Sequence, residues 1–289
     1  MKIPFNPEYF SDELKPCISG VNVSLEYDNV SSALVQAATV IQDLIGEDKY
    51  MALMDKYEPG NIHADETLGY MQRAMIHMAI SDQLIFLITR IGNDGVTVKK
   101  NEDETTIFKY QQDQLEEKLI TTTWFWMDRL ITAINLPQED GVSVTLADFT
   151  RYVGISSPYF LHKAKWIIRE VYEDLILPRY QSKEGFLSKY REKVARAIAY
   201  NVVKIACQRL PYADLPDTIR REVINEHQGK NTPAVADVLK KVAEQYQERA
   251  SKYILDIDSV YLTYGVEQSE RKVIHIRSEY NPNDKFCVS

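Results

Sequence analysis

The five histidines are the residues of this chain best suited to metal binding or to proton transfer near neutral pH. A metal site on one helical face needs a second histidine or a carboxylate at a spacing such as HxxxH or ExxH. Neither spacing occurs around any of the five, which are His63, His77, His162, His227 and His275. The sequence therefore predicts no metal site. We expect His77, which lies within an apolar periodic segment, to be a packed side chain.

Phosphate-binding and nucleophilic motifs are the next residues that could do chemistry. Residues 92–95, Gly-Asn-Asp-Gly, predict a helix stop with a turn and lack the pattern of a phosphate-binding loop. Asp256 and Asp258 are two residues apart, so on a helix their carboxylates face different directions and do not share a metal ion. No GxSxG motif is present, and no cysteine has a base among its sequence neighbours. We therefore expect no enzyme activity and no cofactor, although a triad assembled from distant residues would leave no local motif.

Trp124, Phe125 and Trp126 form an aromatic cluster of a kind that can stack on nucleic-acid bases. Base stacking usually works together with basic side chains that contact the phosphates, whereas the neighbouring Met127 and Asp128 are not basic. The cluster therefore predicts packing in a core or at a protein interface.

Residues 145–163 resemble the helix-turn-helix motif of AraC-type transcription regulators. They combine a short helix, a turn at Gly154, a serine-capped second helix and a Tyr-Phe pair. A recognition helix in the major groove would present His162, Lys163 and Lys165 to the bases. The second helix, however, continues with an apolar stripe beyond the length that the motif needs, and the sequence lacks the two tandem units of that family. A DNA-binding regulator that uses residues 145–167 is one alternative function.

The overall composition suits two helical domains. With 289 residues, the chain exceeds the roughly 100–200 residues of one typical domain. Only 11 glycines and 11 prolines interrupt a composition that is 45% apolar, which favours long helices. No apolar run approaches the roughly 20 residues that span a bilayer, and the first ten residues do not look like a signal peptide. We therefore expect no membrane partner. Cys17, Cys207 and Cys287 are far apart, which indicates free thiols in a reducing cytoplasm.

The net charge of −8 is distributed unevenly along the chain. Residues 1–143 hold 11 Lys and Arg against 23 Asp and Glu, whereas residues 144–289 hold 23 against 19. Such a two-sided distribution suits a protein that stacks against a charged partner or faces DNA. The alternative is that these charges only solvate the surfaces of two ordinary domains.

Helical periodicity divides the chain into two similar bundles with an extended arm at each end. Residues 1–30 contain prolines and a glycine that break any long helix, and they are predicted to be an N-terminal arm. Residues 31–137 form the first predicted bundle, residues 138–265 the second, and residues 266–289 a C-terminal arm. The expected helices cover 31–45, 48–57, 67–91 and 106–135, then 146–153, 158–177, 182–210, 217–227 and a last helix from 233. Because each half has a long central helix between two others, we predict an internal duplication.

The order and spacing of four stretches resemble a known family, the all-helical head–tail connector or ring proteins of tailed phages that infect Bacteroidetes, including crAss-like phages. The first stretch begins with VSLEYDNV at residue 23, and the third is FKYQQDQLEEKL from residue 108. The resemblance covers roughly residues 20–262, through the stretches 23–57, 72–104, 108–119 and 157–215.

This resemblance implies an all-α subunit that assembles as a homo-oligomeric ring, commonly of twelve copies, below the portal protein. Such a ring extends the channel through which genomic DNA passes without sequence-specific contact, and it docks other connector or tail proteins in the virion. The family has no catalytic residues, cofactors or metal ions. We expect the arms to become ordered on assembly, with Ile274, Ile276, Tyr280 and Phe286 as candidate assembly residues. A helical interaction module with another partner is the remaining alternative.

Overall fold

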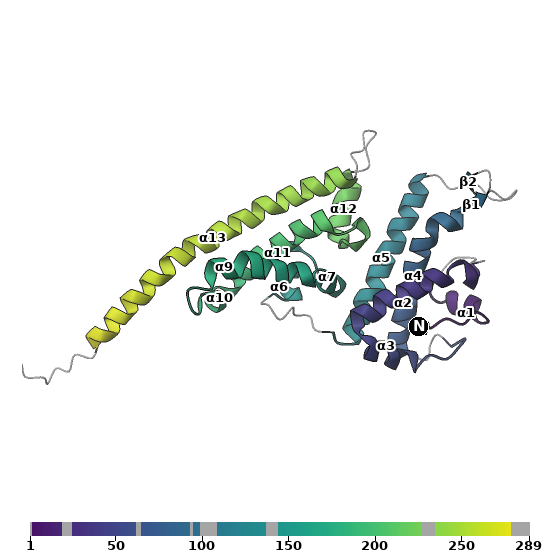
Figure 1. The fold of residues 1–289 in the computed structure, drawn as a ribbon, viewed down its shortest axis with the longest axis horizontal. Coiled ribbons are helices and arrows are strands. Elements are labelled where there is room, and N and C mark those ends of the chain that lie inside the picture. The colour runs from purple at the N-terminus through teal and green to yellow at the C-terminus, as the bar shows by residue number, and fades with distance from the viewer. Residues whose placement is uncertain are drawn as a thin grey trace, which may run out of the picture. The chain divides into compact units, whose positions relative to one another are not determined.

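The computed structural model describes residues 2–18, 25–61, 65–92, 95–98, 109–136, 144–226 and 235–278. The chain divides into two compact units, the first of residues 1–137 with 157–162 and the second of residues 138–156 with 163–289. Most of the described residues are helical (Figure 1), which confirms the predicted all-α fold. Within the described part, no helix is both long and apolar enough to cross a membrane.

The first unit is built from helices and one short hairpin. Its helices before residue 137 are α1 (Phe10–Leu14), α2 (Ser31–Ile45), α3 (Glu47–Met54), α4 (Glu66–Ile88) and α5 (Lys109–Ala133), with a 3-10 turn at Tyr27–Asn29. Between α4 and α5, strand β1 (Thr89–Gly92) pairs antiparallel with β2 (Gly95–Val98). The predicted helix 67–91 therefore ends three residues early, because its β-branched end pairs as a strand.

Helix α4 forms the centre of the first unit. It packs against both α2 and α5. Leu68, Met71, Met75 and Ile76, which belong to its two apolar stripes, are completely buried. This confirms the central position that the two stripes predicted, since a helix that is apolar on more than one side must be covered on more than one side.

The N-terminal segment is not the free arm that the sequence predicted. Phe5, Phe10 and Leu14 are buried in the core of the first unit. The Gln72 side chain donates a hydrogen bond to the Pro4 carbonyl at 2.8 Å, and the Tyr50 hydroxyl donates to the carbonyl of Lys2. The prolines prevent one long helix, but they do not prevent packing of the apolar side chains between them. The prediction of an arm over residues 1–30 is therefore wrong for residues 2–18.

The second unit contains α13, the longest helix that the structure describes. Its elements are α6 (Leu146–Val153), α8 (Lys165–Glu170), a π-helical stretch Val171–Ile176, α9 (Leu177–Tyr180), α10 (Phe186–Lys189), α11 (Arg191–Arg209), a 3-10 turn Tyr212–Asp214, α12 (Asp217–Glu226) and α13 (Val235–Ser278). Helix α7 (Pro158–Lys163) belongs to the first unit except for its last residue. Helix α11 is central here, since it packs against α6, α8 and α13.

The predicted helix 158–177 is broken into shorter pieces. Ala164 leaves helical geometry between α7 and α8, with φ −87° and ψ 1°. Pro178 was predicted to end a helix. It lies instead in the first turn of α9, where the fixed φ of proline fits helical geometry. The π-helical turns immediately before it are a known way in which a helix absorbs such an irregularity.

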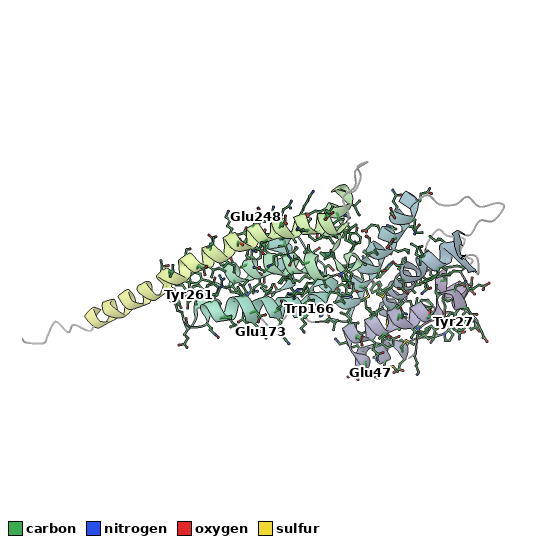
Figure 2. All side chains as sticks on the ribbon, turned by 45° about the horizontal axis from the view of Figure 1, so that its top comes forward. Tyr27, Glu47, Trp166, Glu173, Glu248 and Tyr261 are labelled. Carbon is green, nitrogen blue, oxygen red and sulfur yellow. The ribbon has the colours of Figure 1, made fainter. Side chains whose placement is uncertain are left out.

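Part of the predicted C-terminal arm is helical and belongs to α13. This helix runs without a break over 44 residues, from Val235 to Ser278 (Figure 1). The extended arm predicted from residue 266 is therefore wrong for residues 266–278, because the alternation at residues 273–277 is too short to outweigh propagation of a helix that has already formed. Figure 2 labels Tyr261 on this helix, and its ring meets Phe186 edge to face at 4.8 Å between centroids.

The duplication of the two halves stays a prediction. Both units place a long helix between an earlier and a later one: α4 lies between α2 and α5, and α11 lies between α8 and α13. The shared order of contacts agrees with duplication, but the broken α7–α9 segment has no counterpart of the same form in the continuous α2.

Candidate functional site

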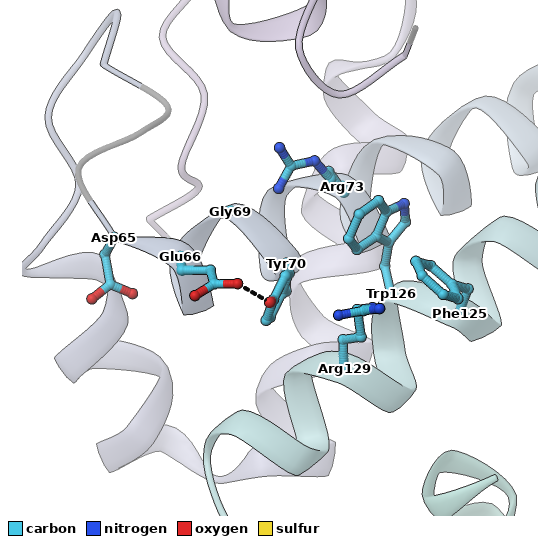
Figure 3. A pocket seen from close by; sticks show the side chains of 8 residues that line it. All are labelled: Asp65, Glu66, Gly69, Tyr70, Arg73, Phe125, Trp126 and Arg129. Atoms are coloured by element: carbon cyan, nitrogen blue, oxygen red, sulfur yellow. Dashed lines mark hydrogen bonds between the residues drawn. The ribbon is translucent and has the colours of Figure 1, made fainter. Parts of the chain in front are cut away.

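A pocket of about 410 Å³ opens on the surface of the first unit, between helices α4 and α5 (Figure 3). Asp65 precedes α4, and the remaining lining side chains project from the two helices. The pocket is lined by Asp65, Glu66, Gly69, Tyr70, Arg73, Phe125, Trp126 and Arg129. We call this group the arginine–aromatic pocket.

The aromatic walls of the pocket form a connected cluster. Tyr70 of α4 stacks on Trp126 of α5 with 5.8 Å between ring centroids and an interplanar angle of 24°. Phe125 meets Trp126 edge to face at 4.8 Å. The Phe125 side chain is 48% exposed, so this aromatic surface reaches solvent and does not belong to the core.

Two arginines lie over these rings. The Arg73 guanidinium is 4.8 Å from the Trp126 ring centroid, and that of Arg129 is 4.7 Å from Phe125. Figure 3 shows both guanidinium groups beside the aromatic cluster. Cation–π contacts hold the two groups in place but leave their N–H donors free for other partners. Neither arginine forms an ion pair with a carboxylate in the described part of the chain.

The two carboxylates of the pocket are already engaged by other groups. Asp65 caps α4 by accepting from the Leu68 amide at 2.9 Å, and it pairs with Lys56 at 2.7 Å. The hydrogen bond from Lys56 is the main cause that lowers the pKa of Asp65. Glu66 accepts a hydrogen bond from the Tyr70 hydroxyl, which Figure 3 marks. The groups left to bind a ligand are therefore the arginines and the aromatic faces.

Trp126, whose ring lines the pocket, has a buried indole N–H. The nitrogen is buried and has no hydrogen-bond partner within the described residues. A buried donor without a partner is destabilising by about 1–3 kcal/mol, so such groups in folded proteins call for an explanation.

The pocket offers hydrogen-bond donors beside aromatic faces. Guanidinium groups donate hydrogen bonds and accept none, so beside the aromatic rings they favour an anionic ligand with an apolar part. Of the cysteines, Cys17 and Cys207 are buried, and burial raises the pKa of each thiol to about 12, so neither supplies a thiolate. Within the described ranges, no cluster of three or more His, Cys, Asp or Glu side chains could hold a metal ion.

The predicted aromatic cluster divides between core and surface. Trp124 is buried and meets Tyr159 edge to face at 4.8 Å, whereas Phe125 and Trp126 line the pocket. Two pocket residues were not predicted from the sequence. Arg129 follows Phe125 by four residues on the same helical face, and Arg73 follows Tyr70 by three. These two spacings were available signals, but nothing in the sequence shows that the two faces meet.

The other candidate residues fall in several places. His77 is buried as predicted, its Nδ1 lies 2.7 Å from the Arg73 carbonyl oxygen, and burial lowers its pKa. Ile274 and Ile276 are in α13 and not in an extended arm. Tyr280 and Phe286 lie outside the described residues.

The residues of the helix-turn-helix alternative are placed in ways that do not favour base recognition. Helices α6 and α7 belong to different compact units. Lys163 pairs with Asp214 at 3.0 Å, and only Lys165 of the expected base-contacting residues is exposed. The Asp128 carboxylate accepts hydrogen bonds at the start of α7 from the Ser157 hydroxyl and the Tyr159 amide, at 2.7 and 2.9 Å. This negative charge would oppose a DNA phosphate there.

Comparison with known proteins concerns the part of the chain that contains the pocket. Residues 27–140 match the model of a family of unknown function, DUF6712. The match includes both walls of the arginine–aromatic pocket and covers less than half of the chain. No curated protein and no solved structure matches the chain.

Proposed function

We propose that this protein is a structural subunit of a phage head–tail connector, which assembles as a ring of about twelve copies below the portal protein. The proposal rests on the resemblance of residues 20–262 to that family. Within the first unit, the observation that carries it is the arginine–aromatic pocket, a ready docking site for another protein.

The composition of the pocket supports a protein partner. Trp, Tyr and Arg are the residues that most often dominate the binding energy of protein interfaces. All three line this pocket, and Phe125 and Arg129 are exposed around them. A partner segment with an aspartate or glutamate beside an apolar residue would pair with Arg73 and Arg129 and cover the rings.

The charge distribution supports a role in a DNA channel. Residues 1–143 carry a large excess of acidic side chains. An acidic channel wall repels the phosphate backbone, so DNA would pass without being held. In this proposal the protein is a virion component that is assembled in the host cytoplasm, and its other partners are further connector or tail proteins.

Co-sedimentation with purified portal assemblies of the phage that encodes the chain tests the docking role of the pocket. We expect the wild-type protein to sediment with the portal, and the R129E variant to lose at least tenfold in affinity because it reverses one of the two cationic groups. R169E is a matched control, since Arg169 is an exposed arginine outside the pocket. Equal co-sedimentation of R129E and wild type would remove the pocket from the interface.

A further inference from the structure

Arg196 of α11 lies between two tyrosine rings of the second unit. Its guanidinium carbon is 4.8 Å from the ring centroid of Tyr152 on α6 and 5.1 Å from that of Tyr253 on α13. Tyr200, one turn after Arg196, packs against the Tyr253 ring at 5.0 Å between centroids and donates a hydrogen bond to the Tyr152 carbonyl at 2.9 Å. Side chains from three helices therefore hold the guanidinium in one position through cation–π contacts.

Arg196 differs from other well-packed arginines of the same unit, because the protein gives it no acceptor. Arg191 pairs with Asp148 at 2.7 Å, and Arg220 donates to the Leu215 carbonyl at 2.6 Å. Arg196 is partly exposed, and its side chain has no hydrogen bond or ion pair with any of the described residues. Its N–H donors are therefore fixed in place and available to an acceptor from outside the chain.

Further cations lie beside Arg196. Burial is the largest cause that raises the pKa of Tyr200, and the charge of the nearby Arg249 acts against it. Lys193 precedes Arg196 by three residues and Arg249 precedes Tyr253 by four, so each lies on the same helical face as the residue it precedes. We call Tyr152, Arg196, Tyr200, Arg249 and Tyr253 the tyrosine–arginine cluster.

The surface around the tyrosine–arginine cluster keeps a surplus of positive charge. Its exposed cations are Arg151, Lys193, Arg249 and Lys252. Of the carboxylates on the same faces, Glu192 already pairs with Arg151 at 3.4 Å, and Asp256 is the other. Such a surface attracts an anion with several charges.

We propose that the tyrosine–arginine cluster binds the phosphate backbone of a nucleic-acid duplex. A guanidinium that is held by stacking and has no carboxylate partner presents a planar set of donors, which suits a phosphate group. The neighbouring cations would contact further phosphates along the same backbone. Contacts of this kind position a protein on a duplex without reading its sequence.

Two other anionic ligands fit the cluster less well. A protein interface has an apolar centre, whereas none of the exposed large apolar side chains of the described residues belongs to this cluster. A single strand is bound by stacking its bases on open aromatic rings. Here the Tyr152 and Tyr253 rings already stack on Arg196 and are only partly exposed.

This site goes beyond the proposed connector role. It belongs to the second unit, whereas the arginine–aromatic pocket belongs to the first. It also differs from the helix-turn-helix alternative, because it uses no residue of the expected recognition helix. Binding is measured on the free chain, so its failure would leave the outcome of the portal experiment unaffected.

Fluorescence anisotropy of the full chain with a labelled DNA duplex of about 30 base pairs, at about 25–150 mM NaCl, tests the proposal. We expect R196A and R249A each to raise the dissociation constant about fivefold and to reduce the salt dependence of log K by about one unit of slope. R169A is the matched control and should bind as wild type does, because Arg169 is an exposed arginine on α8, outside the cluster. R249A alters an exposed side chain, so it tests the site even if R196A loosens the packing of the rings.

A wild-type chain that does not bind the duplex at the lowest salt concentration would overturn the proposal. So would a loss of affinity in R169A equal to that in R249A, because binding would then follow only the overall charge of the unit.

Competition experiments separate the ligand classes. An RNA duplex of the same length should displace the DNA at similar concentrations, since both present a phosphate backbone. A single strand that binds about tenfold more tightly than the duplex would contradict a duplex site. Tighter binding of poly-glutamate than of the duplex, lost in R249A, would instead assign the cluster to an acidic protein partner.

Discussion

At the scale of single residues, the carboxylate of Glu13 fixes the N-terminal segment on the first unit. Glu13 is completely buried, and it accepts hydrogen bonds from the Asn6 amide, the Tyr57 hydroxyl and the Gly60 amide at 2.7–2.9 Å. Burial, together with the hydrogen bond to Glu13, raises the pKa of Tyr57 above its usual range. The segment is therefore held by polar contacts as well as by its phenylalanines.

Replacing Glu13 with glutamine is expected to destabilise the first unit by about 2–3 kcal/mol, because the new amide would face a donor where an acceptor is required. The shift of the urea unfolding midpoint measures this effect. E8Q makes the same chemical change at an exposed position and should leave the midpoint unchanged. An E13Q midpoint equal to that of wild type would show that the Glu13 hydrogen bonds do not hold the segment.

A second residue-scale prediction concerns Asp65 and pH. Its folded pKa is lowered, mainly by the hydrogen bond from Lys56, so its charge stabilises the fold at pH above the unfolded value of about 3.9. That contribution is lost as pH falls through the lower folded pKa.

D65N retains the cap of α4 but loses the charge, so it should be less stable than wild type by about 1 kcal/mol at pH 7. The difference in melting temperature should shrink below about pH 4. D55N, at an exposed carboxylate, is the control, and a difference that persists unchanged at pH 2 would contradict the assignment.

At the scale of elements, α7 is held to α5 by Asp128. Its carboxylate accepts from Ser157 and Tyr159, while the Ser157 hydroxyl accepts from the Phe160 amide at 3.1 Å. Burial is the largest cause acting on this carboxyl group, and it raises the pKa of Asp128. We expect D128A to lower the free energy of unfolding by about 1–2 kcal/mol. We also expect it to speed amide hydrogen exchange in residues 159–163 at least fivefold. D113A, on the exposed side of the same helix, should not change that exchange. Unchanged exchange in D128A would mean that apolar packing alone fixes α7.

Local patterns predicted the helices well but not the contacts between distant parts of the chain. The double stripe of residues 67–91 predicted a central helix, because periodicity reports directly how many sides of a helix are covered. The packing of residues 2–18 could not be predicted in this way, since it depends on bonds such as Gln72 to Pro4, 68 residues apart in sequence. The pocket was missed for the same reason. Its arginines and rings have regular spacing within α4 and within α5, but only tertiary packing brings the two helices together.

At the scale of the whole molecule, the two units present different means of association. The first unit offers an open pocket with two arginines beside exposed aromatic rings. The second unit offers a helix of 44 residues on which Leu255 and Leu262, seven residues apart, are exposed. Neither feature contributes to a core, and both have the composition of surfaces that bind other proteins. Both surfaces agree with our proposal of a structural subunit that contacts other proteins.

Electron microscopy of negatively stained portal assemblies, mixed with the purified protein, tests the connector role most directly. We predict a collar of added density on one face of the portal, with the same rotational symmetry as the portal. Portal particles without a collar, at protein concentrations well above micromolar, would contradict that role. Added density without the symmetry of the portal would contradict it as well.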